Sequence, residues 1–153
     1  MRRSEYQRKA NTRDASKLRV GVVVSDFNSD ITHALLDGAL ETLAEWRVKK
    51  ENIVVRHVPG GFEIPLGCLQ LLRKRRLDAI IALGCVLKGE TKHDEYISNA
   101  VAHGITDIMI AKQIPIAFGV LTPNTLEQAR ARSQGEANKG REAAVAALEM
   151  VLN

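Results

Sequence analysis

The segment from residue 84 to 93 holds the most distinctive chemistry of this chain. It reads Gly-Cys-Val-Leu-Lys-Gly-Glu-Thr-Lys-His and joins an apolar run, residues 79–83, to a helical pattern that begins near Asp94. In an open α/β sheet, ligands bind where a strand ends and the next helix begins. The free N–H groups of a helix N-terminus favour anions, and a histidine beside an anion can transfer protons. The segment therefore predicts proton transfer by His93 on a phosphorylated or carboxylated substrate.

Several side chains around this helix start bear on anion binding. The donors are Lys88, Thr91 and Lys92. The charge of Glu90 would repel a phosphate, so we expect its backbone N–H to be used and its side chain to turn away. A lone histidine is more often a cap or a surface residue, and this alternative stays open for His93. We interpret the other histidines, His33, His57 and His103, as cap or surface residues.

The elements that must position these residues alternate along the chain. Predicted buried strands cover residues 18–24, 53–58, 79–83 and 114–121. Predicted helices cover residues 31–47, 63–75, 94–111, 126–132 and 142–152, with Ser29 or Asp30 as the cap of the first. Short apolar strands that alternate with helices indicate a parallel sheet covered on both faces. We therefore expect one α/β domain, residues 17–153, after a basic arm, residues 1–16.

Other unusual residues also follow predicted strands, so they should share one edge of the sheet. Phe27 lies in a polar loop, where it either stacks on a planar heterocycle or fills a subunit interface. The glycines at 60 and 61 allow a close backbone approach, or merely form a turn. Glu63 offers a carboxylate to ligand hydroxyls, or it stabilises a helix start. A basic cluster near the end of the chain comprises Arg130, Arg132, Lys139 and Arg141.

Composition excludes several classes of protein. The 153 residues suffice for one domain, and 45% hydrophobic with 26% charged residues is ordinary for a soluble protein. No apolar stretch reaches the ~20 residues of a membrane span. Cys68 and Cys85 fit no metal or disulfide pattern, which favours a reducing cytoplasm. Motifs of ATP-, dinucleotide- and serine-dependent catalysis are missing. For the basic arm we favour a solvated or subunit-docking role, and we expect no nucleic-acid or membrane partner.

Six ordered segments resemble the 6,7-dimethyl-8-ribityllumazine synthase family. They are Ser25–Asn28 with Leu35–Ala39, Val58–Pro65, Asp78–His93, Phe118–Thr122, Glu127–Ala129, and Asn138–Gly140 with Leu148–Met150. The resemblance implies a single-domain, flavodoxin-like α/β/α sandwich with a four-stranded parallel sheet, which an N-terminal strand exchanged between subunits would extend. It also implies a transferase of the penultimate step of riboflavin biosynthesis.

In that family 5-amino-6-(D-ribitylamino)uracil condenses with 3,4-dihydroxy-2-butanone 4-phosphate. The two substrates form a Schiff base, phosphate leaves, and the ring closes with loss of water to give 6,7-dimethyl-8-ribityllumazine. The resemblance implies that no cofactor and no metal take part. It implies active sites between the subunits of a homopentamer, twelve of which form an icosahedral shell in some members, and an association with riboflavin synthase.

The resemblance assigns roles to matching positions. His93 would shuttle protons, and Arg132 would bind phosphate from a neighbouring subunit, as Phe118 would reach the pyrimidine. The residues implied for the pyrimidine and ribityl chain are Phe27, Gly61, Phe62, Glu63, Cys85, Val86, Leu87 and Phe118. Those implied for the phosphate are Glu90, Thr91, Arg132 and Lys139.

Three positions depart from the family pattern. Asp26 stands where the family often has arginine, Cys85 replaces a frequent threonine, and the 133–137 loop is about one residue shorter than usual. These departures keep an alternative open, in which the chain is a low-activity paralogue that binds flavins or lumazines or forms a shell.

Overall fold

A single parallel sheet forms the centre of the molecule in the computed structural model, which describes residues 12–153. Most of the predicted basic arm, including Arg2, Arg3, Arg8 and Lys9, lies outside the described residues. The strands are β1 (Val20–Ser25), β2 (Ile53–Val58), β3 (Ala79–Cys85) and β4 (Ile116–Leu121). Their order in space is β2-β1-β3-β4, and all neighbouring pairs are parallel.

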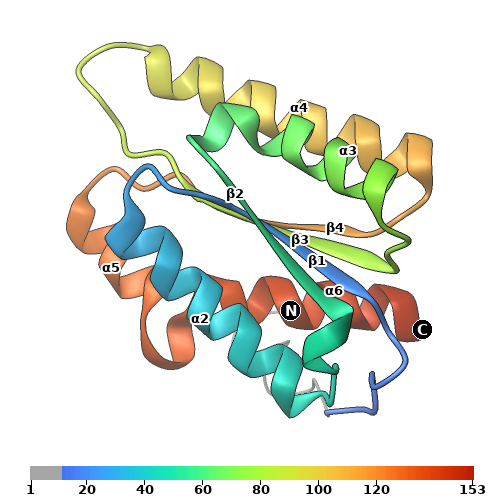
Figure 1. Ribbon diagram of the computed structural model, residues 1–153. Coiled ribbons are helices and arrows are strands. Elements are labelled where there is room, and N and C mark those ends of the chain that lie inside the picture. Colours follow the sequence, from blue (N-terminus) through green and yellow to red (C-terminus); the bar gives the residue numbers. More distant parts are fainter. Residues whose placement is uncertain (1–11) are drawn as a thin grey trace.

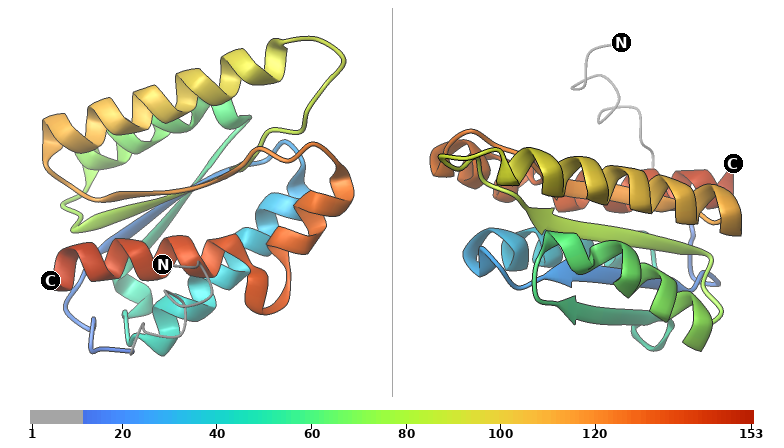
Figure 2. Two further views of the ribbon diagram at one scale, coloured as in Figure 1. Left: turned by 180° about the vertical axis from the view of Figure 1, so that it is seen from behind. Right: turned by 90° about the horizontal axis from the view of Figure 1, so that it is seen from above.

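Helices cover both faces of this sheet. Those on one face are α3 (Ile64–Lys74) and α4 (His93–Lys112) (Figure 1). Those on the other are α2 (Ser29–Glu45), α5 (Leu126–Ser133) and α6 (Lys139–Leu152), an arrangement also visible from behind and from above (Figure 2). Short 3₁₀ turns, η1 (Lys50–Asn52), η2 (Gly61–Glu63) and η3 (Gly135–Ala137), complete the fold. The predicted flavodoxin-like α/β/α sandwich is confirmed.

The two inner strands carry the core. Every residue of β1 and β3 is buried, because helices cover both faces. The side chains of one face pack with α2 and α6 around Val22, Leu83 and Leu148. Those of the other face pack with α3 and α4 around Val23 and Ile80. Within residues 12–153, none of the helices has the length and apolar character that a bilayer crossing requires.

Local capping moves several element ends from their predicted positions. The N-cap of α2 is Asn28 in the left-handed conformation (φ 59°, ψ 49°), and the prediction of Ser29 or Asp30 is wrong. Asparagine is one of the few residues that adopt this conformation readily. Helix α6 begins at Lys139, not at Glu142, because the Asn138 side chain accepts the Gly140 N–H at 2.8 Å. Residue 140 therefore lies in a helix and not in the predicted loop.

Smaller shifts occur elsewhere. Strand β1 spans Val20–Ser25 in place of 18–24, and β4 begins at residue 116 in place of 114. Helices α2, α3 and α4 also begin and end within two residues of the predicted positions. These offsets leave the order and type of every predicted element intact.

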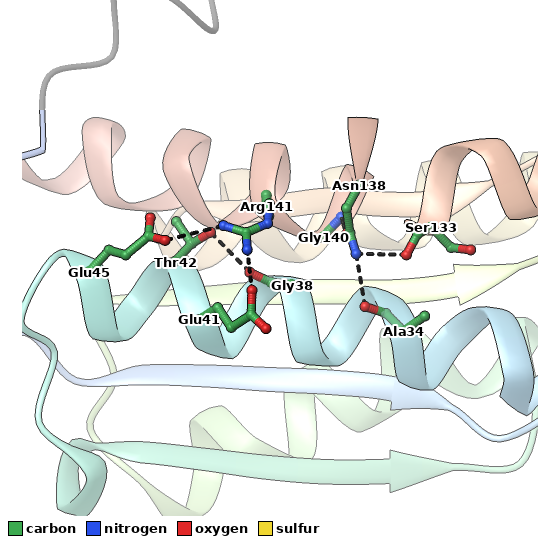
Figure 3. A network of polar contacts seen from close by, with 9 residues as sticks. All are labelled: Ala34, Gly38, Glu41, Thr42, Glu45, Ser133, Asn138, Gly140 and Arg141. Carbon is green, nitrogen blue, oxygen red and sulfur yellow. Dashed lines mark hydrogen bonds and ion pairs between the residues drawn. The ribbon is translucent and has the colours of Figure 1, made fainter. Parts of the chain in front are cut away.

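Helices α2 and α6 cross at a contact that fixes the start of α6 (Figure 3). The Asn138 amide donates to the carbonyls of Ala34 at 2.9 Å and Ser133 at 2.7 Å. A Cβ atom at Gly140 would lie 1.9 Å from the Leu35 carbonyl oxygen, so only glycine permits this approach. Arg141, the next residue, pairs with Glu41 and Glu45 of α2 at the same crossing (Figure 3).

The segment that leads into β1 packs on the end of α2. Ala15 is buried, and its N–H donates to the Trp46 carbonyl at 2.8 Å. The Arg13 guanidinium lies 5.9 Å from the centre of the Trp46 ring and donates to the Asn153 side chain at 3.1 Å. The described end of the predicted arm, Arg13 and Ala15, therefore contacts the rest of the chain directly.

Candidate active site

The loops that follow β1 and β2 are joined at the carboxyl edge of the sheet. The Asp26 N–H donates to the Val58 carbonyl at 2.8 Å, and the Phe27 N–H donates to the Pro59 carbonyl at 3.0 Å. Phe27 and Phe62 are the aromatic residues of these loops, and they are 71% and 61% exposed. Large exposed rings on two loops that are joined to each other are typical of a surface that a ligand or another subunit covers.

Glu63 has a fixed place at the end of the second loop. Its Oε2 atom accepts the Gly60 N–H at 3.0 Å, and its own N–H donates to the Gly60 carbonyl at 3.3 Å. This contact agrees with the structural interpretation of Glu63, in which one carboxylate oxygen organises the helix start. Within residues 12–153 the other oxygen has no hydrogen-bond donor, and its binding of a ligand hydroxyl stays a prediction.

Backbone hydrogen bonds hold the loop that follows β3. The Val86 N–H donates to the Leu121 carbonyl at 2.8 Å, and the Lys88 N–H donates to the Pro123 carbonyl at 3.0 Å. Among residues 12–153, the Leu87 N–H between them has no hydrogen-bond acceptor. This peptide group therefore remains available to a ligand at the edge of the sheet.

Cys85 contributes to this loop through its backbone. Its side chain is buried, and burial, with a further contribution from the charge of Asp30, raises the pKa of the thiol to about 11. Its carbonyl accepts the Asn28 side-chain N–H at 3.0 Å. Sequence reasoning missed this role of Asn28. The signal was a residue type that tolerates the left-handed conformation, placed directly after a strand.

His93 is the first residue of α4, at the far end of the same loop. Its backbone N–H donates to the Thr91 hydroxyl at 3.4 Å, and the Gly89 N–H donates to the Asp94 carboxylate at 3.3 Å. Glu90, Thr91 and His93 are exposed. Within the described chain the imidazole of His93 has no hydrogen-bond partner, so it is accessible to a substrate. The residues from these three loops are called the loop group below; they are Phe27, Gly61, Phe62, Glu63, Cys85, Val86, Leu87, Glu90, Thr91 and His93.

The remaining predicted residues line a separate cavity of about 280 Å³ beside the edge strand β4, called the edge cavity below. Phe118 is 47% exposed there. The Arg132 guanidinium donates to the Gln128 carbonyl at 3.0 Å, and the Lys139 ammonium pairs with Glu142 one turn later. The lining residues are Phe118, Gly119, Val120, Leu121, Thr122, Pro123, Gln128, Arg132 and Lys139.

Within residues 12–153, the loop group and the lining of the edge cavity are two distinct sets of residues. The edge cavity contains no residue of the loop group. Strand order separates Phe27 and Phe62, which follow β1 and β2, from Phe118 of β4 on the opposite edge. The loop after β3 borders the edge cavity, because its backbone is bonded to Leu121 and Pro123. Phe27, Phe62, Glu63 and His93 thus lie on loops that follow β1, β2 and β3, with the exposed Lys88 and Lys92 beside His93, whereas Arg132 and Lys139 line the edge cavity.

A further cluster, not indicated by any spacing in the sequence, lies beside the loop group. The Asp26 Oδ1 atom is 2.7 Å from Nδ1 of His57 and 3.3 Å from Nε2 of His33. Hydrogen bonds from His57 and His33 lower the pKa of the Asp26 carboxyl. Sequence reasoning treated both histidines as isolated surface residues. The available signal was their position near the ends of β2 and the start of α2, which meet at the same sheet edge.

Comparison with known proteins identifies relatives along nearly the whole chain. A family model described as 6,7-dimethyl-8-ribityllumazine synthase matches residues 17–153. The protein of that name from Parabacteroides distasonis is 47% identical over 139 residues, which cover 90% of this chain and 87% of the relative. Its counterpart from Christiangramia forsetii is 47% identical over 139 residues, 90% of this chain and 83% of the relative. The counterpart from Porphyromonas gingivalis is 46% identical over 134 residues, with 87% and 83% coverage.

Proposed function

Since the chain belongs to the 6,7-dimethyl-8-ribityllumazine synthase family, we propose that its loop group and its edge cavity together form the site of lumazine synthesis. The chain is a transferase of riboflavin biosynthesis. It condenses 5-amino-6-(D-ribitylamino)uracil with 3,4-dihydroxy-2-butanone 4-phosphate and releases phosphate and water. The relatives all carry the name of this enzyme, and they give no support to the alternative of a ligand-binding or shell-forming paralogue.

The observation that carries the assignment of the site is the complementarity of the two surfaces. The loop group offers exposed aromatic rings, an oriented carboxylate and an imidazole. The lysines of these loops, Lys88 and Lys92, are both exposed. The edge cavity offers Arg132 and a further aromatic ring. A planar pyrimidine and a phosphate ester need both sets of groups.

The pyrimidine would stack on Phe27 and lie against Gly61 and Phe62. The peptide group of Leu87 would bind the polar edge of the ring, with Cys85 and Val86 forming the backbone wall. The ribityl hydroxyls would donate to the Glu63 oxygen that Gly60 leaves free. Phe118 of a neighbouring subunit would cover the opposite face of the ring.

The phosphate would bind between the start of α4 and Arg132 of the neighbouring subunit. A guanidinium matches two phosphate oxygens at once. Lys139 lines the same cavity, but its pairing with Glu142 leaves Arg132 as the stronger candidate. Thr91 and the backbone of Glu90 would add donors at the helix N-terminus.

His93 would move the protons that the condensation requires. Schiff-base formation needs a proton on the departing hydroxide, and loss of phosphate needs a proton removed from the adjacent carbon. Ring closure with loss of water again needs a group that donates one proton and removes another. An imidazole can donate and accept a proton in turn, and the exposed position of His93 supports this role.

We further propose that the enzyme is a cytoplasmic homopentamer with one site at each subunit boundary, and that pentamers can assemble into a shell. The separation of the loop group from the edge cavity supports a site between subunits, because a heterologous contact can join the two surfaces in a ring. The position of β2 at the edge of the sheet supports the exchange of an N-terminal strand between subunits. Association with riboflavin synthase, which uses the product, belongs to the same proposal. The two buried free cysteines fit a reducing compartment.

The test is a spectroscopic assay of the purified protein with both substrates, with formation of the lumazine chromophore as the signal. We expect turnover well above the spontaneous reaction, and a loss of about 10²–10⁴-fold in His93→Ala, the usual contribution of general acid–base catalysis. His103→Ala, another exposed histidine of α4, is the matched control and should retain wild-type turnover. Background turnover by the correctly assembled wild-type protein would refute the proposed site.

A further inference from the structure

We propose that Asp26, His33 and His57 form a binding site for a divalent transition-metal ion, of which Zn²⁺ is the best match. The three side chains come from the turn after β1, the second turn of α2 and the end of β2. Their three ligand atoms all lie within 4.8 Å of one another. Two imidazoles and one carboxylate form a zinc ligand set that leaves a fourth position open for water.

The distances are close to those that a bound ion requires. With bonds of about 2.0–2.1 Å and tetrahedral angles, two ligand atoms of one zinc ion lie roughly 3.3 Å apart. The Asp26 Oδ1 and His33 Nε2 atoms are already 3.3 Å apart. The separation of 2.7 Å between Asp26 Oδ1 and His57 Nδ1 has to open by a few tenths of an ångström. All three side chains are about half exposed, so small rotations can provide this change.

The backbone beneath the cluster is fixed by the fold. The Asp26 N–H donates to the Val58 carbonyl, and strand register places His57 opposite Val24. The first turn of α2 is held by the Asn28 carbonyl, which accepts the N–H groups of residues 31 and 32 at 3.0 Å. The ligands are thus preorganised by the sheet and the helix, and metal binding need not organise a loop.

Ligand chemistry selects the class of ion. Imidazole nitrogen suits Zn²⁺, Cu²⁺ and Ni²⁺, whereas Mg²⁺ and Ca²⁺ prefer sites made entirely of oxygen. The two rings meet edge to face with centres 5.6 Å apart, so one nitrogen of each ring points to the shared carboxylate. Among residues 12–153 no other group of three such side chains comes together. The cluster lies outside the loop group, so this metal site is independent of the proposed function.

The test is isothermal titration of the untagged, EDTA-treated full-length protein with ZnCl₂, in parallel with Co²⁺ absorption spectroscopy. We expect one tight site per chain and a visible Co²⁺ spectrum of tetrahedral type. His33→Ala, His57→Ala and Asp26→Asn should each weaken Zn²⁺ binding at least about tenfold. MgCl₂ should give no saturable heat.

His103→Ala is the matched control, because His103 is exposed on α4 and has no place in the cluster. It should leave both the stoichiometry and the affinity for Zn²⁺ unchanged. Circular dichroism checks that each variant is folded. The proposal is overturned if millimolar Zn²⁺ gives no saturable binding. It is also overturned if the tight site is retained in His33→Ala and in His57→Ala.

Discussion

Arg132 and Lys139 line the same cavity, but their surroundings differ. Lys139 is largely buried and paired with Glu142, whereas within the described chain Arg132 donates only to the Gln128 carbonyl. Arg132→Ala should therefore raise the KM for the phosphorylated substrate by the equivalent of roughly 2–5 kcal/mol, the usual effect of truncating one partner of a buried charged pair. Lys139→Ala should have a smaller effect. Steady-state kinetics with each substrate varied in turn would measure both.

Phe27→Ala is the contrasting variant for this experiment. It removes the ring assigned to the pyrimidine and should raise the KM for that substrate first, by about 1 kcal/mol beyond the loss of buried area. If Arg132→Ala weakened both substrates equally, its assignment to the phosphate would be wrong.

The two cysteines have buried thiols with raised pKa values. Burial raises the pKa of Cys68 from its ordinary 9.0 to about 12 and that of Cys85 to about 11. Because the thiolate is the reactive form, neither residue of the native protein should react with Ellman's reagent near pH ~8. Denatured protein should react at both. A rapidly reacting thiol in the native protein would contradict the buried placement of these side chains.

The same pKa values predict alkaline destabilisation. The folded-state values lie above the unfolded value, so the stabilisation is complete below pH 9.0 and is lost as pH rises through 11 and 12. Urea titrations on both sides of this window should show the free energy of unfolding falling with pH. A Cys68→Ala/Cys85→Ala variant is the control and should show a smaller fall.

The sequence predicted which loops carry the candidate site but not the contacts between them. Strand ends can be read from apolar runs, and parallel strands share a carboxyl edge, so Phe27, Phe62 and His93 could be assigned to one edge. The sequence also places Asp26, His33 and His57 near this edge, but it does not give their hydrogen bonds, which depend on how the start of α2 lies beside the ends of β1 and β2. That arrangement is set by packing between segments distant in sequence.

At the scale of elements, the crossing of α2 and α6 depends on glycine. Gly140→Ala would place a Cβ atom against the Leu35 carbonyl, and backbone atoms cannot rotate away as a side chain can. We expect the free energy of unfolding to fall by about 2–4 kcal/mol, at the upper end of the effects of overpacking. Urea denaturation followed by circular dichroism would measure it.

Gly89→Ala is the matched control for this prediction. Gly89 lies in the exposed loop before α4, and an added Cβ atom would meet nothing closer than an Asp94 oxygen at 4.0 Å. This substitution should change the free energy of unfolding by no more than about 0.5 kcal/mol. Equal effects of the two substitutions would show that the close approach of α2 and α6 is unimportant for stability.

Element order was predictable because strands and helices have different hydrophobic periods. The runs of β1 and β3 are apolar at successive positions, as expected for strands covered on both faces. The start of α6 was not predictable in this way. Gly140 suggested a loop, but it is tolerated inside the helix because the crossing with α2 requires a small residue and Asn138 caps the new end.

At the scale of the whole molecule, the separation of the loop group from the edge cavity makes a prediction about assembly. His93→Ala damages the first surface, and Arg132→Ala damages the second, so each variant alone should be nearly inactive when the phosphorylated substrate is held near the wild-type KM. In a mixed oligomer, some sites would pair the loop group of an Arg132→Ala subunit with the edge cavity of a His93→Ala subunit. Such a site contains no substituted residue.

Random mixing of equal amounts makes about a quarter of the sites intact in a ring of heterologous contacts. Co-expressed or co-refolded variants should therefore recover about a quarter of the wild-type rate, measured through lumazine absorbance. The two variants assembled separately and mixed just before the assay are the control and should stay inactive. The edge cavity of each chain lies beside β4, the strand farthest from β2. The rate is therefore expected to recover only if the edge cavity of a neighbouring subunit completes the site. No recovery in verified mixed oligomers would mean that a single chain forms the site.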